Sequence, residues 1–442
     1  MSLLSPLKTA LSSQQPAVQA QEALARANSN TGRNVYLAMD RERVLAEAEA
    51  LTARFPEPAQ RPPLFGVPIG VKDCFDVAGY PTTCGSHFYA AQNGIAAADS
   101  AVAARLREAG ALIMGKTHLH QLAYGITGEN SEYGDCAQPE NPQALTGGSS
   151  SGSSASVQEG SSVASIGTDT GGSVRVPAAL CGLAGYRSTL GLGGAKAWEG
   201  GFHLAVSFDT LGWLFRDLRD GPALAAALLD VPVVAAPQGV SIAAVGEGYV
   251  HDCEPAVLEM YRGWQTELGG NGAQIRVFEP DFWSDAREIF AGIQAHEAAA
   301  VHRGYFEHFE PVVRDRLASG ASLSDATIED LRKRHVVFRG LMDRLLQEHD
   351  FLMLPCAPMT TLAVGADHSA TRVKILRYTS PISLAGMPAV TLPAKGGGVQ
   401  LVAARGNDAR LLAFAASLGE KIALQQSRLG CYAAMHEDAS TS

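Results

Sequence analysis

Two clusters rich in glycine and serine constrain this chain more than any other feature. They lie at Gly147–Ser153 and at Gly171–Ser173. A flexible Gly/Ser linker would stay polar throughout, but the segment between the clusters contains Val163, Ala164 and Ile166, which suit a close-packed interior. Residues without bulky side chains let one backbone segment approach another, or approach a ligand. The sequence therefore predicts a buried site built from main-chain N–H groups and serine hydroxyls.

A serine in such a site needs a base that accepts its proton before it can attack a carbonyl group. None of the twelve histidines lies in the segment 146–189. Residues 148–152 match the G-x-S-x-G pattern, but that turn requires a buried strand directly before it, and Pro-Glu-Asn-Pro stands at 139–142. Lys72 is the better candidate, because it ends a short apolar run that predicts a buried strand. Desolvation lowers the pKa of a buried lysine and allows it to act as a base.

Three motifs, in this order, resemble the amidase signature family of amide hydrolases. They are GVPIGVKD at 66–73, GGSSSGS at 147–153 and GTDTGGSVRVPA at 167–178. The resemblance extends over roughly residues 15–425 and is weak in 231–350. It implies an α/β fold and hydrolysis of a carboxylic amide bond.

The resemblance also assigns roles to individual residues. Lys72 matches the family's base, Ser149 its bridging serine, which a cis peptide bond holds, and Ser173 its acyl-forming nucleophile. In the family, the oxyanion hole consists of backbone N–H groups that correspond here to Thr170, Gly171, Gly172 and Ser173. Neutral Lys72 would accept a proton from Ser149, which would accept one from Ser173 as it attacks. Each oxyanion donor contributes about 2.7–4 kcal/mol in comparable hydrolases.

Other residues around this set have implied or expected roles. Tyr124, Gly125, Ile126 and Thr127 correspond to the family's loop that lines the substrate channel, although Tyr124 could instead end a core helix with Gly125 as its C-cap. Asp169 and Arg175 are expected to order the oxyanion loop through hydrogen bonds. The chain departs from the family at 187–189, where Arg-Ser-Thr replaces the common Lys-Pro-Thr. That departure weakens inference about the substrate more than inference about the chemistry.

Taken singly, each motif has another interpretation. Lys72 alone could be a surface lysine that extends out of a strand end. The first cluster alone is more often a flexible loop, and Gly171–Ser173 alone could form an anion-binding nest at the start of a helix. The three motifs together, in the family's order, favour an amidase.

The pattern after residue 63 predicts strands that alternate with helices. Residues 64–72 predict a pair of strands, 101–109 a helix that Asp99 or Ser100 caps, and 111–115 a further strand. Such a βαβ unit indicates a parallel or mixed sheet covered by helices. We therefore expect a single α/β/α domain around a large mixed β-sheet.

The chain is expected to divide into five segments. These are N-terminal helices packing on the core (1–60, with two helices in 17–55), the catalytic core (61–230), a variable helical region covering the site (231–350), the C-terminal part of the core sheet (351–430) and a tail (431–442). Within them we expect a loop and helix at 116–130, a strand at 240–245, helices at 253–268, 285–306 and 322–349, strands at 351–355, 383–393 and 398–403, and a closing helix at 409–421.

Composition excludes several classes of protein. A formal net charge of −10 and the absence of a basic block argue against nucleic acid as a direct partner. Seven scattered cysteines without a C-x-x-C pair indicate reduced thiols in a cytoplasmic protein, with no zinc site. The N-terminus does not resemble a signal peptide, and no apolar run reaches the length of about 18 residues that a membrane span needs. The relay needs no metal and no cofactor.

The predicted activity is therefore hydrolysis of a small-molecule amide, and the homodimer is a family-level expectation. Alternatives are the A subunit of a glutamyl-tRNA amidotransferase-like complex that releases ammonia from glutamine, an esterase, and a non-catalytic homologue. Arg372, Lys374 and Arg377 could bind an acidic substrate or could form a solvated basic face. The sequence carries no signature of the particular substrate.

Overall fold

The apolar run that ends in Lys72 forms strand β2 (Pro68–Lys72), and all five of its residues are buried. Strand β2 lies inside the sheet, between β3 (Leu112–Thr117) and β4 (Ala164–Asp169), and it is parallel to both. A strand buried on both faces and between parallel neighbours has a continuous apolar sequence. The candidate base therefore lies at the carboxyl end of a central strand.

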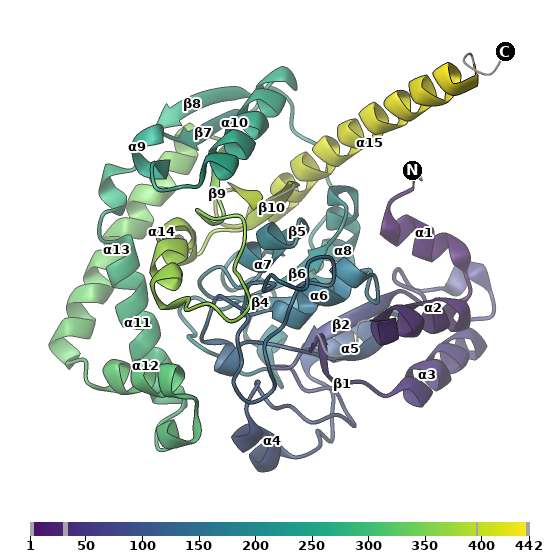
Figure 1. Ribbon diagram of the computed structural model, residues 1–442, viewed down its shortest axis with the longest axis horizontal. Helices are drawn as coiled ribbons and strands as arrows, with labels where there is room; N and C mark the ends of the chain where they lie inside the picture. Colours follow the sequence, from purple (N-terminus) through teal and green to yellow (C-terminus); the bar gives the residue numbers. More distant parts are fainter. Residues whose placement is uncertain (1–3, 30–33, 395–396, 439–442) are drawn as a thin grey trace.

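The computed structural model describes residues 4–29, 34–394 and 397–438. It contains an 11-stranded sheet in the order β1-β3-β2-β4-β6-β5-β10-β11-β9-β7-β8, with helices packed around it (Figure 1). Parallel pairs at β2–β3, β2–β4, β7–β8 and β7–β9 coexist with antiparallel pairs such as β4–β6 and β10–β11. The predicted α/β domain around a large mixed sheet is confirmed. The other strands are β1 (Tyr36–Ala38), β5 (Ala184–Arg187), β6 (Thr210–Phe215), β7 (Ser241–Val245), β8 (Gln274–Phe278), β9 (Phe351–Pro355), β10 (Ala389–Ala394) and β11 (Gly397–Val402).

The α-helices lie before, between and after the strands along the chain. They are α1 (Pro6–Ser13), α2 (Pro16–Ser29), α3 (Arg41–Arg54), α4 (His87–Asn93), α5 (Ala101–Glu108), α6 (Ser151–Glu159), α7 (Arg175–Leu180), α8 (Gly221–Leu229), α9 (Glu247–Val250), α10 (Pro255–Gly270), α11 (Ala286–Val301), α12 (Pro311–Ala321), α13 (Asp325–Glu348), α14 (Ser369–Ala385) and α15 (Asp408–Asp438).

The predicted βαβ unit forms around α5. Ser100 caps this helix, because its side chain accepts a hydrogen bond from the backbone of Ala103. Gly110, with φ of +79°, follows the helix and turns the chain into β3. The predicted strand pair at 64–72 is wrong, since only β2 forms. The backbone N–H groups of Leu64 and Gly66 donate to the carbonyl groups of Ala109 and Gly110 instead of to a neighbouring strand.

The helix predicted within 116–130 does not form. This segment contains only a 3₁₀ turn at Gln121–Ala123. Leu122 and Ala123 both have φ of +56°, a left-handed conformation that stops an α-helix from propagating. The loop therefore passes the site as irregular backbone.

The region 231–350 contributes strands as well as helices. Strands β7 and β8 extend the sheet at one edge, and β8 was not predicted. Its side chains are half-buried or exposed, with Val277 76% exposed, so it lacks the apolar face that marks a strand in a sequence. Helices α11, α12 and α13 follow it (Figure 1).

The C-terminal part of the chain begins with α14. The strand predicted at 383–393 starts later than expected, because α14 continues to Ala385 and ends at Gly386, which has φ of +68°. Helix α15 runs beyond its predicted end to Asp438 and projects from the body of the molecule (Figure 1). Residues 439–442 of the predicted tail lie outside the described residues.

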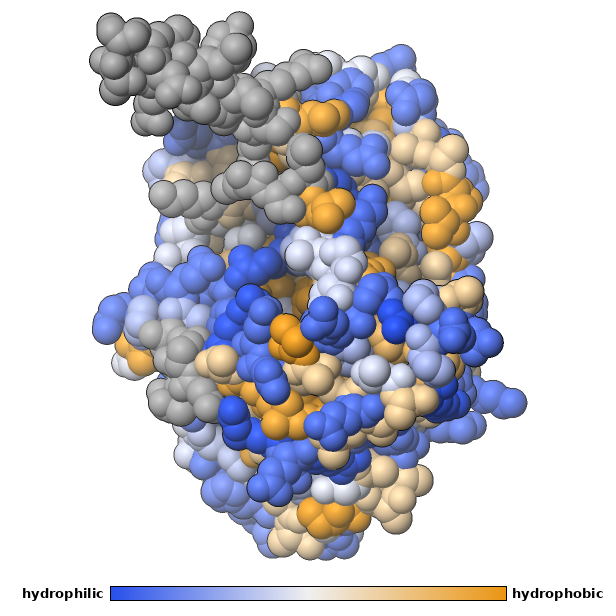
Figure 2. Space-filling model, turned by 90° about the vertical axis from the view of Figure 1, so that its right-hand side faces the viewer, coloured by the Kyte–Doolittle hydropathy of each residue, from blue (hydrophilic) through white to orange (hydrophobic). Residues whose placement is uncertain are grey.

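The surface seen from the side of α15 and the N-terminal helices alternates hydrophobic and hydrophilic groups (Figure 2). No helix in the described ranges combines the length and the apolar character that crossing a bilayer requires.

Candidate active site

Lys72 lies with its side chain completely buried at the end of β2. Its Nζ donates hydrogen bonds to Ser149 Oγ and to Thr168 Oγ1, each at 2.8 Å. Burial lowers the pKa of Lys72 from 10.5 to about 8, and nearby groups that include Asp209 and Asp169 offset only part of this effect. The structure thus brings the predicted base and the predicted bridging serine into direct contact.

Ser149 follows a cis peptide bond to Gly148. The backbone around it is tightly enclosed: Gly148 N donates to Ile126 O at 2.8 Å, and Ser149 O accepts a hydrogen bond from His120 N at 3.2 Å. A Cβ atom on Gly148 would lie 2.8 Å from the backbone nitrogen of Gly128. Glycine is therefore required at 148 because no side chain fits there. The first Gly/Ser cluster is therefore tightly packed backbone and does not act as a flexible linker.

Ser173 lies in the loop between β4 and α7 and is 4% exposed. Its carbonyl oxygen accepts a hydrogen bond from Ser150 N at 3.2 Å, so the two Gly/Ser clusters meet next to Ser149. Within the described part of the chain, the hydroxyl of Ser173 has no hydrogen-bond partner. The link from Ser149 to Ser173 therefore stays a prediction.

The backbone amides of the second cluster are not equivalent. Gly172 N donates to Asp169 Oδ1 at 2.9 Å, so this amide is already paired. The N–H groups of Thr170, Gly171 and Ser173 make no hydrogen bond among the residues that the structure describes. A Cβ atom at Gly171 would lie 2.8 Å from the ring of Phe290, which explains the absence of a side chain there.

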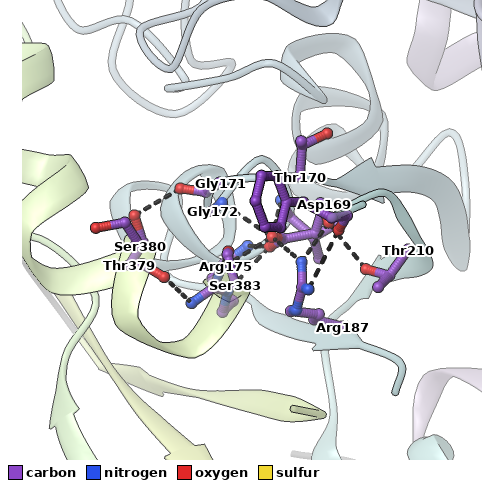
Figure 3. A network of polar contacts seen from close by, with 12 residues as sticks. Asp169, Thr170, Gly171, Gly172, Arg175, Arg187, Thr210, Thr379, Ser380 and Ser383 are labelled. Atoms are coloured by element: carbon purple, nitrogen blue, oxygen red, sulfur yellow. Dashed lines mark hydrogen bonds and ion pairs between the residues drawn. The ribbon is translucent and has the colours of Figure 1, made fainter. Parts of the chain in front are cut away.

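Asp169 holds this loop in place at the centre of a buried ionic network (Figure 3). Arg175 donates to both of its carboxylate oxygens, at 3.0 and 2.9 Å, and Arg187 Nη1 donates to Oδ1 at 2.8 Å. All three side chains are completely buried. Burial alone would raise the pKa of Asp169, but attraction to Arg175 and Arg187 outweighs burial and holds the pKa far below its usual range.

The network extends to α14, which sequence reasoning did not place near the site. Arg175 donates to Ser383 Oγ at 2.8 Å and to Thr379 O at 3.2 Å. Thr379 Oγ1 donates to Gly171 O at 2.5 Å (Figure 3). Helix α14 therefore packs directly against the predicted oxyanion loop.

The Asp169 network leads to a prediction about stability. Asp169→Asn is expected to lower the free energy of unfolding by about 3–5 kcal/mol, because it leaves two buried guanidinium groups without their shared counter-charge. Urea unfolding followed by circular dichroism measures the change. Glu329→Gln, which breaks an exposed pair with Lys333, is the control and should cost less than about 0.5 kcal/mol. A loss for Asp169→Asn no larger than that of the control would contradict the role of the network.

The loop 124–127 lines two cavities. Gly125, Ile126 and Thr127 contribute to a cavity of about 320 Å³, and Tyr124 to a neighbouring cavity of about 760 Å³. Lys72, Ser149 and Ser173 do not line either cavity. The smaller cavity is linked to these three residues through Ile126, which lines it. The carbonyl group of Ile126 accepts the hydrogen bond from the backbone N–H of Gly148, next to Ser149.

Several residues of the site were missed by sequence reasoning. Thr168 gives Lys72 its second hydrogen-bond partner, and Asp209 Oδ1 accepts a hydrogen bond from Thr170 Oγ1 at 2.6 Å. Arg187 was noticed only as a departure from the common Lys-Pro-Thr triplet, and Thr379 carries no local signal. Thr168 lies within the third motif, at 167–178, and this position is the feature of the sequence that could have identified it as a site residue.

Comparison with known proteins gives consistent matches. The family model described as Amidase matches residues 19–412. AtzE of Pseudomonas sp. (strain ADP), which belongs to a 1-carboxybiuret hydrolase, is 31% identical, over 89% of this chain and 92% of that protein. Amidase 1 of Oryza sativa subsp. japonica is 31% identical, over 81% of this chain and 91% of that protein. A crystal structure of an amidase superposes with a TM-score of 0.84 at 30% identity, over 95% of this chain and all of the other.

Proposed function

The chain belongs to the amidase signature family, whose members hydrolyse C–N amide bonds, and on that premise we propose that it cleaves a linear carboxylic amide through an acyl-enzyme on Ser173. The observation that carries the proposal is the buried hydrogen bond of 2.8 Å between Lys72 Nζ and Ser149 Oγ. A lysine with a pKa of about 8 is neutral in roughly a tenth of molecules at pH 7. It then has a lone pair for the proton of Ser149.

The reaction uses one proton relay in both of its stages. Lys72 accepts the proton of Ser149, Ser149 accepts that of Ser173, and Ser173 Oγ forms a bond to the carbonyl carbon. The carbonyl oxygen becomes an oxyanion. When the C–N bond breaks, the relay runs backwards and delivers the proton to the leaving nitrogen. Water then attacks the acyl-enzyme through the same relay and releases the acid.

The oxyanion is stabilised by backbone N–H groups. We assign this role to Thr170, Gly171 and Ser173, whose amides are unpaired in the described residues, and we leave out Gly172, whose amide is bonded to Asp169. Each donor is expected to contribute about 2.7–4 kcal/mol to the transition state. Asp169, Arg175 and Arg187 act on catalysis indirectly, by fixing the loop that carries these amides.

The proposed function is tested by a panel of linear primary amides of graded size. The purified chain alone is expected to release ammonia from at least one of them at a rate well above that of the Ser173→Ala blank. It should also react covalently with a serine-directed fluorophosphonate. A chain that neither releases ammonia nor reacts with the probe would be the non-catalytic homologue. An ester panel run beside the amides measures any esterase activity.

A second candidate function is supported by the A subunits of glutamyl-tRNA(Gln) amidotransferases among the relatives. That of Cyanothece sp. (strain PCC 7425 / ATCC 29141) is 30% identical, over 81% of this chain and 83% of that protein. In that case the chain would act on glutamine within a complex. Affinity purification from the native cell, followed by a glutaminase assay with and without the co-purifying proteins, separates the two functions. Activity that appears only in their presence would favour the complex.

We further propose that the chain works in the cytoplasm and as a homodimer. Six of the seven cysteines are free and buried, as expected where thiols stay reduced; they are Cys74, Cys84, Cys136, Cys181, Cys253 and Cys356. The homodimer rests on the family resemblance alone. Light scattering of the purified chain measures its mass directly.

A further inference from the structure

The cavity of about 320 Å³ lies between the loop 125–127 and the start of α14. Residues 367–369 and Arg372 form one wall, and Gly125, Ile126 and Thr127 form another. Arg316 of α12 and His120 complete this side. Arg316 and Arg372 also line the neighbouring cavity of about 760 Å³, so these two guanidinium groups stand where the cavities meet.

Among the described residues, the two arginines have no carboxylate within ion-pair distance. In the described residues neither Arg316 nor Arg372 forms an ion pair, and both lie 5.8 Å from the ring centroid of Tyr124. Arg316 donates to Tyr124 O at 2.6 Å, and Arg372 makes one long hydrogen bond of 3.4 Å to Gln294. Burial and repulsion from Arg316 lower the pKa of Arg372 to about 10, so it still carries its charge at neutral pH. A partly buried guanidinium without a counter-charge calls for an anion.

The acidic residues of the same cavity are already engaged. Glu310 accepts hydrogen bonds from the backbone and hydroxyl of Ser131, Asp135 from Asn130 N, Glu129 from Thr127 Oγ1, and Asp367 from Ser369 N. Glu310 and Glu129 lie close enough to attract Arg316, but no carboxylate has a comparable effect on Arg372. The unmet positive charge is therefore centred on Arg372.

A second polar side chain, that of His120, also faces this cavity. His120 is 5% exposed, and neither of its ring nitrogens has a hydrogen-bond partner among the described residues. Its Nε2 lies 3.6 Å from Glu310 Oε1. Burial lowers the pKa of His120 well below its usual value, with a further contribution from Arg316, so the ring is neutral. A neutral imidazole can donate one hydrogen bond to a ligand.

Helix α14 connects this charge to the reaction centre. Arg372, Leu376 and Thr379 are spaced i, i+4 and i+7, which places them on one face of the helix. Leu376 Cδ2 and Thr379 Cβ lie against Gly171 and Gly172, within 3.3 and 2.9 Å of the Cβ position of each glycine. At 1.5 Å rise per residue, Arg372 is roughly 6 Å along the axis from Leu376 and roughly 10 Å from Thr379.

The neighbouring basic residues of α14 behave differently. Arg377 is paired with Asp252 at 2.5 Å and lies over the ring of Tyr249. Lys374 is exposed. Of the three basic residues that the sequence suggested for an acidic substrate, only Arg372 lines the cavity.

We propose that the cavity binds a carboxylate carried by the amide substrate, with Arg372 as the residue that pairs with it and Arg316 as its neighbour in the same anion site. This inference rests on the proposed amidase function and names its substrate class. Arginine suits the task because its planar guanidinium can donate two parallel hydrogen bonds to a carboxylate. Along the axis of α14, roughly 6–10 Å separate Arg372 from the residues that contact Gly171 and Gly172, and this separation sets the range of chain lengths that the substrate series should cover.

Two series of substrates test the proposal. The first contains monoamides of dicarboxylic acids from malonic to suberic acid, which carry the charge on the acyl side. The second contains N-acetyl-ω-amino acids, which carry it on the amine side. Each acid is compared with its methyl ester, which has nearly the same shape without the charge. The wild-type chain is expected to prefer the acid over the ester in one series, and that series tells on which side of the scissile bond the charge lies.

Substitutions at Arg372 give the decisive comparison. Arg372→Gln is expected to lower kcat/KM for the preferred acid at least about thirty-fold, mainly through KM, because a charge pair is lost. Turnover of the neutral ester should change less than about threefold. Arg372→Lys should recover part of the loss. Lys374→Gln, on the same helix but exposed, is the matched control and should leave both substrates unchanged.

The outcomes separate this inference from the proposed function. If no amide is hydrolysed, the proposed function fails, and calorimetric binding of glutarate and adipate to the wild type and to Arg372→Gln still tests the anion site. The carboxylate site would be refuted if Arg372→Gln lowered kcat/KM equally for the acid and its methyl ester. It would also be refuted if the wild type and Arg372→Gln bound the diacids with equal affinity.

Discussion

Ser173→Ala is expected to lower kcat for any amide that the chain hydrolyses by roughly 10⁴–10⁶-fold, because in the proposed mechanism the acyl-enzyme forms on the Ser173 hydroxyl. The fold should survive unchanged. The Ser173 hydroxyl has no hydrogen-bond partner in the described part of the chain, so its removal leaves no buried group unsatisfied. Ammonia release measures the rate, and mass spectrometry after fluorophosphonate treatment should find the adduct on the wild type alone.

Ser150→Ala is the matched control for this experiment. Ser150 is the central serine of the G-x-S-x-G match, and its Oγ donates to Thr168 O at 3.3 Å. We expect Ser150→Ala to lower the free energy of unfolding somewhat and to lower kcat much less than Ser173→Ala does. The opposite ranking, with Ser150→Ala inactive and Ser173→Ala active, would assign the nucleophile to Ser150 and refute the proposed relay.

Lys72→Met is expected to remove several orders of magnitude in kcat while the chain stays folded. Methionine fills a similar volume but cannot accept a proton. Burial has lowered the pKa of Lys72 from 10.5 to about 8, so the folded state opposes protonation, and loss of the amine should leave stability at pH 7 unchanged or increased. Kinetics and urea unfolding on the same preparation check both expectations.

The pH dependence of the wild type tests the same residue. Because the base must be neutral, activity should rise with pH and level off above about 8, where Lys72 has lost its proton. Lys72→Arg should be inactive at every pH, since a guanidinium keeps its charge. Near-normal activity in Lys72→Met would refute the relay, and a rate that does not change with pH around the pKa of about 8 would show that Lys72 is not the titrating base.

The sequence predicted the parts of the site that short motifs encode. Lys72, Ser149 and Asp169 each stand in a motif. The parallel pairing of β2 with β4 sets the strands that end in Lys72 and Asp169 side by side, and Lys72 Nζ donates to Ser149 Oγ. Local patterns also predicted α5 and placed its cap at Asp99 or Ser100, of which Ser100 is the cap in the structure, because helix ends depend on a few neighbouring residues.

What could not be predicted depends on contacts between distant segments. Arg187 reaches Asp169 because β5 pairs with β6, which in turn pairs with β4. Thr379 meets Gly171 from a helix 208 residues further along the chain. No local pattern encodes such distances. The edge strand β8 was missed for a different reason, because its side chains are half-buried or exposed and give it no apolar face.

The packing of α14 against the glycine loop has a consequence for redesign. This one helix holds Arg372 at its start and supports the carbonyl of Gly171 through Thr379. In the proposed mechanism, substrate selection and turnover therefore both depend on α14, and a change that shifts this helix to admit a larger amide would also disturb the glycine loop that carries the proposed oxyanion donors. Variants intended to accept new substrates should alter the part of the opposite wall that α12 forms, at Pro311 and Val312, and leave α14 and the loop 125–127 where they are.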